Sequence, residues 1–273
     1  RVALTVTGQW PATVTLALKP PTGVTAEPAQ VTLTAGPEPA RADVVLTPAE
    51  SVHLGTLRIP WETTSPDARY NLSGVLKVRV AEPVPSVTIE RTDAAPTIDG
   101  DLGDAVWQRD PDIPALNLLA GGKPASEATS VWLSYDAEAL YVAFRCAESQ
   151  MNKLVAKHSE RGAPLYQDDD VEVFIEVPGA TAVKQFAVNA LGTISDNFGN
   201  QAPWHAAAKQ YDDRWTVEIA IPWAVLGVER APAPGDSWGM QFGRQEKPKS
   251  ETSAWTPGQA FNVPEGFGLV VFE

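Results

Sequence analysis

Residues 167–177, QDDDVEVFIEV, decide the fold of the larger part of this chain. In a β-strand, successive side chains point to opposite faces of the sheet. From Val171 to Val177 the odd positions are all apolar and β-branched, whereas the even positions from Asp170 onward are mostly carboxylates. This alternation predicts a strand with one face in a hydrophobic core and a charged face outside.

The same alternation assigns faces in the neighbouring predicted strands. In LYVAFRC the apolar positions leave Arg145 outside, and in VKQFAVNA they leave Gln185 and Asn189 outside. Together with Glu172, these are planar groups that make several hydrogen bonds each. Sugar hydroxyls both donate and accept hydrogen bonds, so they suit such groups. The pattern predicts a polar sugar-binding surface made of Arg145, Glu172, Gln185 and Asn189.

Two tryptophans fall in polar loops between the predicted strands: Trp204 in GNQAPWHA and Trp255 in ETSAWTPGQ. Sugars also present apolar C–H faces, and an indole ring in a polar loop is a suitable platform for them. The alternative is that each ring packs over an end of the sandwich, because tryptophan is seldom exposed without a reason. Trp204 and Trp255 are the candidate stacking residues, and Arg244 is a further hydrogen-bonding candidate.

The chain as a whole is predicted to be all-β, with two β-sandwiches. It contains 24 Pro and 20 Gly, and it shows no long amphipathic helix. Residues 1–83 consist of short strands between turn signals, which is typical of a small immunoglobulin-like sandwich. The proline-containing stretch AEPVPS, residues 81–86, predicts a stiff linker. Residues 84–273 then form a second, larger sandwich.

Charge is distributed unevenly between these parts. Residues 1–85 contain 7 Lys+Arg and 7 Asp+Glu, so the net charge of −13 comes entirely from residues 86–273. An acidic surface repels phosphate backbones, which argues against nucleic acid as a partner. It is compatible with neutral ligands or with calcium.

Calcium takes six to eight oxygen ligands, and two acidic stretches offer them: DGDLGD and DDD. Asp168 and Asp170 in the second stretch are the favoured metal ligands. The first stretch is equally well explained as a turn. The single cysteine, Cys146, falls at an apolar strand position and is predicted to pack in the core.

No apolar run is long enough to cross a bilayer, and no signal peptide is present. The chain begins at Arg1 inside a strand-like pattern, so we interpret it as a fragment of a longer protein. If that parent is secreted, its signal lies upstream of Arg1.

Several motifs of the second part occur in an order that is specific to one family: PTIDGDLGDAVWQ, VWLSYDAEALYVAFRCAE, DDDVEVFIEV, QFAVNALGTISD, WTVEIAIPWAVLG, GDSWGMQFGRQE and SAWTPGQAFNVPEGFGLVVF. Through them, residues 87–273 resemble the family 9 carbohydrate-binding modules, which are related to the DOMON-like sandwiches. Residues 1–83 loosely resemble the immunoglobulin-like accessory domains found beside bacterial carbohydrate-active enzymes.

The resemblance implies a jelly-roll-like sandwich that is non-catalytic and binds a mono-, oligo- or polysaccharide, with calcium as a structural ion. It implies a secreted or cell-surface protein of bacterial extracellular or periplasmic type. Upstream domains of the parent, such as the catalytic domain of a glycoside hydrolase, would be further partners.

Three alternatives stay open. Both sandwiches could be structural spacers of a surface protein with a degenerate sugar site. The second could bind haem, as some DOMON-like relatives do, with His158 or Met151 among the axial ligands. It could also be a glycoside hydrolase, for which Glu172 and Glu218 would supply the required pair of carboxylates.

Overall fold

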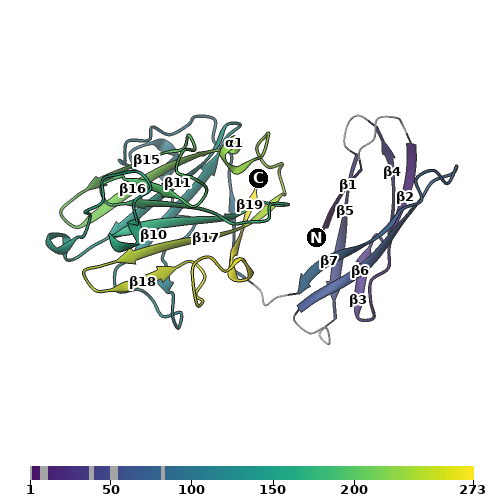
Figure 1. Ribbon diagram of the computed structural model, residues 1–273, viewed down its shortest axis with the longest axis horizontal. Coiled ribbons are helices and arrows are strands. Elements are labelled where there is room, and N and C mark those ends of the chain that lie inside the picture. The colour runs from purple at the N-terminus through teal and green to yellow at the C-terminus, as the bar shows by residue number, and fades with distance from the viewer. Residues whose placement is uncertain (1, 7–11, 37–39, 50–54, 81–83) are drawn as a thin grey trace. The chain divides into compact units, whose positions relative to one another are not determined.

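The computed structural model describes residues 2–6, 12–36, 40–49, 55–80 and 84–273 (Figure 1). The chain divides into two compact units, Arg1–Pro83 and Val84–Glu273. Nearly all regular structure in the described residues is β, which confirms the predicted fold class.

The first unit contains two antiparallel sheets. One has the strand order β1-β5-β3 and the other β4-β2-β6-β7. Leu18, Val44 and Ile59 form its small buried core. The strands are β1 (Val2–Val6), β2 (Ala12–Leu18), β3 (Val24–Glu27), β4 (Gln30–Ala35), β5 (Ala40–Pro48), β6 (Gly55–Thr64) and β7 (Ser73–Val80). The immunoglobulin-like assignment of this unit stays a prediction.

The second unit is a β-sandwich of two sheets. The small sheet has the order β10-β11-β16-β15, and its strands are β10 (Thr129–Tyr135), β11 (Ala139–Ala147), β15 (His205–Gln210) and β16 (Arg214–Pro222). Every pairing in this sheet is antiparallel. This sheet forms one layer of the sandwich (Figure 1).

The large sheet has the order β14-β13-β12-β17-β18-β9, and β19 pairs with both β17 and β8. Its strands are β8 (Ser86–Ile89), β9 (Asn117–Leu118), β12 (Asp170–Glu176), β13 (Lys184–Asn189), β14 (Ile194–Asp196), β17 (Ser237–Glu246), β18 (Glu251–Ala254) and β19 (Gly268–Phe272). The short helices are η1 (Ala105–Trp107), η2 (Met151–Lys153), η3 (Leu165–Gln167), α1 (Trp223–Leu226) and η4 (Pro264–Gly266).

The main core lies between the two sheets and follows the predicted alternation. In β12, Val171, Val173 and Ile175 are fully buried in this core. Phe144 of β11 meets Phe242 of β17 across the sandwich, with ring centroids 6.2 Å apart. Strand β12, which lies within residues 167–177, is therefore a central strand of the large sheet and pairs with β13 and β17.

Each sheet is also partly covered on its outer face. On the small sheet, Trp107 of η1 packs against Trp132 and Tyr141. On the large sheet, Phe174 packs against Phe261 and Phe267 of the segment after β18. The parts of these two outer faces that stay open are therefore the candidate ligand sites. Among the described residues, no helix is long and apolar enough to span a membrane.

Candidate functional site

The open end of the large sheet's outer face brings two of the predicted residues together. The Nε2 group of Gln185 in β13 donates a hydrogen bond of 2.5 Å to Oε2 of Glu172 in β12. Gln245 in β17 also hydrogen-bonds to the Glu172 carboxylate. Glu172 is buried, whereas Gln185 and Gln245 are half-buried. A carboxylate and two amides from three adjacent strands thus converge at this end.

Asp170 lies on the same face, one step along β12. It is fully buried, yet both carboxylate oxygens have no hydrogen-bond partner among the described residues. Burial raises the pKa of Asp170 well above its ordinary value, and the nearby charge of Glu172 raises it further. Burial likewise raises the pKa of Glu172, against the lowering effects of Gln185 and Lys247. A buried polar group without a partner is costly, so this end of the sheet holds unused hydrogen-bonding capacity.

An exposed aromatic ring belongs to the same end. Tyr166 in η3 is 61% exposed. Its carbonyl oxygen accepts a hydrogen bond of 2.6 Å from the Lys247 ammonium, and the charge of Lys247 acts on Asp170 and Glu172. We call this set the Glu172 face: Tyr166, Asp170, Glu172, Gln185, Gln245 and Lys247. Sequence reasoning missed Tyr166, although an aromatic residue in the polar stretch LYQDDD was a usable signal.

Arg145 does not join this face, contrary to the prediction. It lies on β11, in the small sheet, and its guanidinium sits over the ring of Trp132 at 5.3 Å from the centroid. Glu172 belongs to the large sheet. Both side chains point away from the core, but on opposite sides of the sandwich.

The hypothetical catalytic pair fails for the same reason. Glu218 belongs to β16 of the small sheet, so it faces away from Glu172. Its carboxylate accepts hydrogen bonds from the backbone N–H groups of Asp99 and Gly100, at 3.1 and 2.8 Å, and from the Trp107 indole at 2.7 Å. Glu218 therefore anchors the segment that covers its sheet.

The two predicted stacking tryptophans are buried in the core. Trp204 is 1% exposed, its indole N–H donates to Asp196 at 3.1 Å, and its ring meets Phe186 edge-on. Trp255 is 7% exposed and packs against Phe242. Both loops fold back over the sandwich because burying a large ring is more favourable than exposing it. The prediction of exposed platforms is wrong for both residues.

The side chains of Asn189 and Arg244 are also buried and paired with other residues of the fold. Asn189 is fully buried and donates to the Asp168 carboxylate at 2.9 Å and to the His158 carbonyl at 2.8 Å. Arg244 is 1% exposed and forms an ion pair of 3.2 Å with Glu148. Neither side chain is open to a ligand, which corrects both predictions.

The predicted metal ligands, Asp168 and Asp170, are both fully buried. Oδ2 of Asp168 accepts hydrogen bonds from the backbone N–H groups of Lys157 and His158 as well as from Asn189, and Oδ1 lies 3.1 Å from the His158 imidazole. Asp170 alone cannot supply six to eight oxygens. No group of three or more potential ligands lies close enough together in the described part of the chain. Structural calcium stays a prediction.

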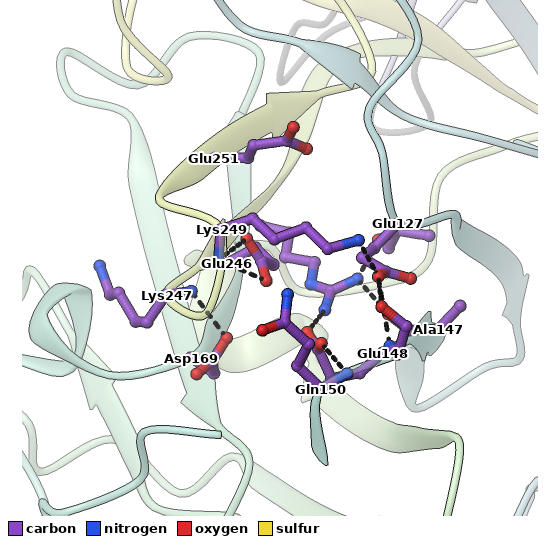
Figure 2. Close-up of polar contacts among 12 residues, drawn as sticks. Glu127, Ala147, Glu148, Gln150, Asp169, Glu246, Lys247, Lys249 and Glu251 are labelled. Atoms are coloured by element: carbon purple, nitrogen blue, oxygen red, sulfur yellow. Dashed lines mark hydrogen bonds and ion pairs between the residues drawn. The ribbon is translucent and has the colours of Figure 1, made fainter. Parts of the chain in front are cut away.

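A second polar cluster lies at the turn of the β17–β18 hairpin. Figure 2 shows Glu127, Glu148 and Glu246 converging there, with the Lys249 ammonium reaching Glu127. Burial raises the pKa of Glu246 to about 7, and the adjacent carboxyl group of Glu148 raises it too. Arg244 opposes this effect. Glu246 therefore takes up a proton near neutral pH in the folded state.

Glu246 is expected to make the second unit less stable as pH rises. Its folded pKa of about 7 lies above the ordinary value of 4.5, so its contribution is fully present below 4.5 and is lost as pH rises through 7. Thermal unfolding of Glu246→Gln across this window should show a flatter pH dependence than the wild type. The exposed Glu229→Gln is the matched control and should keep the wild-type slope. Equal slopes in all three proteins would contradict the assignment.

Comparison with known proteins identifies the family to which the second unit is similar. The family model for the carbohydrate family 9 binding domain-like proteins matches residues 98–273. A search of curated proteins found no match. Two structures of a family 9 carbohydrate-binding module from Caldicellulosiruptor kristjanssonii, one in complex with cellotriose and one with glucose, are similar over 69% of this chain. They have 19% identity and a TM-score of 0.52, and the match covers 93% and 95% of those chains.

The family match spans well over half of the chain and nearly all of the second unit. Family 9 modules are non-catalytic carbohydrate-binding modules, which confirms the prediction of a binding module in place of an enzyme. The chain belongs to the carbohydrate family 9 binding domain-like proteins.

Proposed function

We propose that the second unit binds a neutral saccharide at the Glu172 face. The observation that carries this proposal is the exposed ring of Tyr166 at the same end of the sheet as the Glu172–Gln185 pair, with the unpartnered Asp170 buried beneath them. Carboxyl, amide, ammonium and aromatic groups of this kind meet both requirements of a sugar. They satisfy its hydroxyls and they cover an apolar face of its ring.

The hydrogen bonds divide by chemistry. Glu172 accepts from sugar hydroxyls, while the amides of Gln185 and Gln245 and the ammonium of Lys247 donate to them. Because the Glu172 carboxylate is held by two amides, it is fixed in position before the ligand arrives. Such preorganisation reduces the ordering cost of binding.

The aromatic platform is Tyr166 in this proposal. Its ring is exposed, and a tyrosine side chain has few rotatable bonds, so little freedom is lost on stacking. A sugar on this ring would lie beside the polar end of β12. The similar modules bound to cellotriose and glucose support a sugar of this class.

Tyr166→Ala should weaken binding of cellotriose or glucose by about tenfold or more, measured by isothermal titration calorimetry. The loss is expected because an exposed aromatic anchor supplies most of the apolar contact with a sugar. Tyr70→Ala is the matched control, since Tyr70 is an exposed tyrosine of the first unit. Unchanged affinity in Tyr166→Ala, with clear binding by the wild type, would refute the assignment of this ring.

We further propose that the chain is part of a larger extracellular protein, with the first unit as a spacer between the module and upstream domains. Extracellular placement is typical of family 9 modules and supports this proposal. Fractionation of cells that produce the parent protein tests it. Recovery of the protein from the cytoplasm alone would contradict it.

A further inference from the structure

A groove of about 1030 Å³ lies on the outer face of the small sheet, on the other side of the sandwich from the Glu172 face. Ser130, Trp132, Arg145 and Thr216 of β10, β11 and β16 form part of its lining. Its volume is at the upper end of the range of about 300–1,000 Å³ for small-molecule sites. The groove is therefore large enough for several sugar units.

One wall of the groove is a rigid segment, residues 101–111. It is fixed to the sheet by the Trp107 indole, which donates to Glu218 at 2.7 Å, and by the Arg109 carbonyl, which accepts from the Trp132 indole at 2.8 Å. Just before it, the Gly100 carbonyl accepts from the Thr216 hydroxyl at 2.6 Å. These bonds join the wall to two strands, so the groove is built into the fold.

Arg145 is the distinctive group of the groove. It is exposed, and apart from its place over the Trp132 ring its side chain has no hydrogen bond or ion pair with any described residue. The other two arginines of the groove are both paired, Arg109 with Asp112 at 2.8 Å and Arg214 with Asp213 at 2.7 Å. A cation–π contact with an indole uses none of the N–H donors of a guanidinium. Arg145 thus offers unused donors within the groove.

The groove also offers an unused acceptor and carries no net charge. The Asp110 carboxylate is exposed and has no hydrogen bond with the described residues. The charged lining residues are three arginines and three aspartates: Arg109, Arg145, Arg214, Asp101, Asp110 and Asp213. Free donors and acceptors in a neutral lining suit a ligand whose groups both donate and accept, as hydroxyls do. The lining has no net charge and so gives an anionic ligand no long-range attraction.

We propose that this groove is a second carbohydrate site, which takes a neutral oligosaccharide with Arg145 as its principal hydrogen-bond donor. Asp110 accepts from the sugar hydroxyls, and the partly exposed ring of Tyr211 contributes apolar contact. The module then has two sites on opposite faces of one sandwich. Two such sites would let it bind two chains of an insoluble polysaccharide at once and gain affinity through multivalency.

The test is a titration of the whole chain with cellotriose and xylotriose, followed by NMR of the tryptophan indole N–H groups. Phenylalanine substitutions assign the Trp107 and Trp132 signals, and both residues lie in the groove. A saturable shift of these signals, weakened by about tenfold or more in Arg145→Ala, is the expected result. Arg230→Ala, an exposed arginine outside the groove, is the matched control and should behave as wild type.

The two sites can be separated in the same experiment. In Tyr166→Ala the groove signals should still shift, because that ring is on the other face. Groove signals that stay fixed at millimolar concentrations of both sugars would overturn the second site, whatever happens at the Glu172 face. Binding of a trigalacturonate alone would overturn the assignment to a neutral sugar. Arg145→Lys, which keeps the charge but loses the planar fork, should bind no better than Arg145→Ala.

Discussion

Replacing Arg244 by alanine should destabilise the second unit by about 3–5 kcal/mol, because it breaks a buried ion pair and leaves one partner uncompensated. Arg244 is 1% exposed and pairs with the fully buried Glu148 at 3.2 Å. Its guanidinium also donates to the Ala147 carbonyl at 2.9 Å and to the Thr129 hydroxyl at 3.2 Å. Without it, the Glu148 carboxyl would act on Glu246 with no buried arginine to offset it. Chemical denaturation of the variant and the wild type measures the loss.

Two comparisons separate lost charge compensation from lost packing. Arg214→Ala breaks an exposed pair with Asp213 and should cost at most about 1 kcal/mol. The double variant Arg244→Met, Glu148→Gln removes both buried charges and should recover part of the stability. If the double variant were as unstable as the sum of its single changes, packing would account for the loss.

The loss in Arg244→Ala should also depend on pH. The charge of Arg244 lowers the pKa of Glu246, so its removal raises that pKa further. A raised folded pKa means that stability is present at low pH and is lost as pH rises. The variant should therefore be closest to wild type below about pH 4.5 and furthest from it above about pH 7. A constant difference across this range would contradict the electrostatic explanation.

The strands and their inner faces could be predicted from sequence because they depend on a local pattern. Val171, Val173 and Ile175 alternate with polar residues, and the structure buries all three. The same holds for Phe144 in β11 and for Phe186 in β13. A period of two fixes which side chains face the core, whichever strands come to lie beside them.

The composition of the outer faces could not be predicted in the same way. Alternation shows that Arg145 and Glu172 both point away from the core, but not that β11 and β12 belong to different sheets. That difference arises from pairings between strands distant in sequence, such as β11 with β16 and β12 with β17. Local patterns carry no information about such pairings. For this reason the residues of the predicted sugar-binding surface are divided between the outer faces of the two sheets.

The prediction of exposed aromatic residues was wrong for a related reason. Loop position does not determine whether a ring is exposed, because a loop can fold back over the end of a sandwich. Trp204 and Trp255 do so, whereas the smaller Tyr166 stays exposed. For Trp204, the Asp196 carboxylate accepts a hydrogen bond from the indole N–H. The free-energy cost of burying this polar group is therefore small. That acceptor lies in a different strand, β14, and only the folded chain brings it into place.

Trp204→Ala is expected to destabilise the second unit by about 3–5 kcal/mol through the loss of a large buried side chain. The ring packs edge-on against Phe186 at 5.1 Å, and its removal also leaves the Asp196 carboxylate without an indole donor. Denaturant unfolding measures the loss. Weak sugar binding by this variant would then reflect unfolding and would say nothing about contact with the ligand.

Trp204→Phe separates the two roles, because phenylalanine keeps most of the apolar packing and removes only the indole donor. It should unfold at a lower denaturant concentration than the wild type, yet bind saccharide with the same affinity while folded. Leu191→Ala, at an exposed residue, is the control for a change that creates no cavity and should unfold close to wild type. A folded Trp204→Phe protein with a clear loss of affinity would place this ring at the ligand. It would also mean that the loop opens to expose it, since the ring is 1% exposed in the structure.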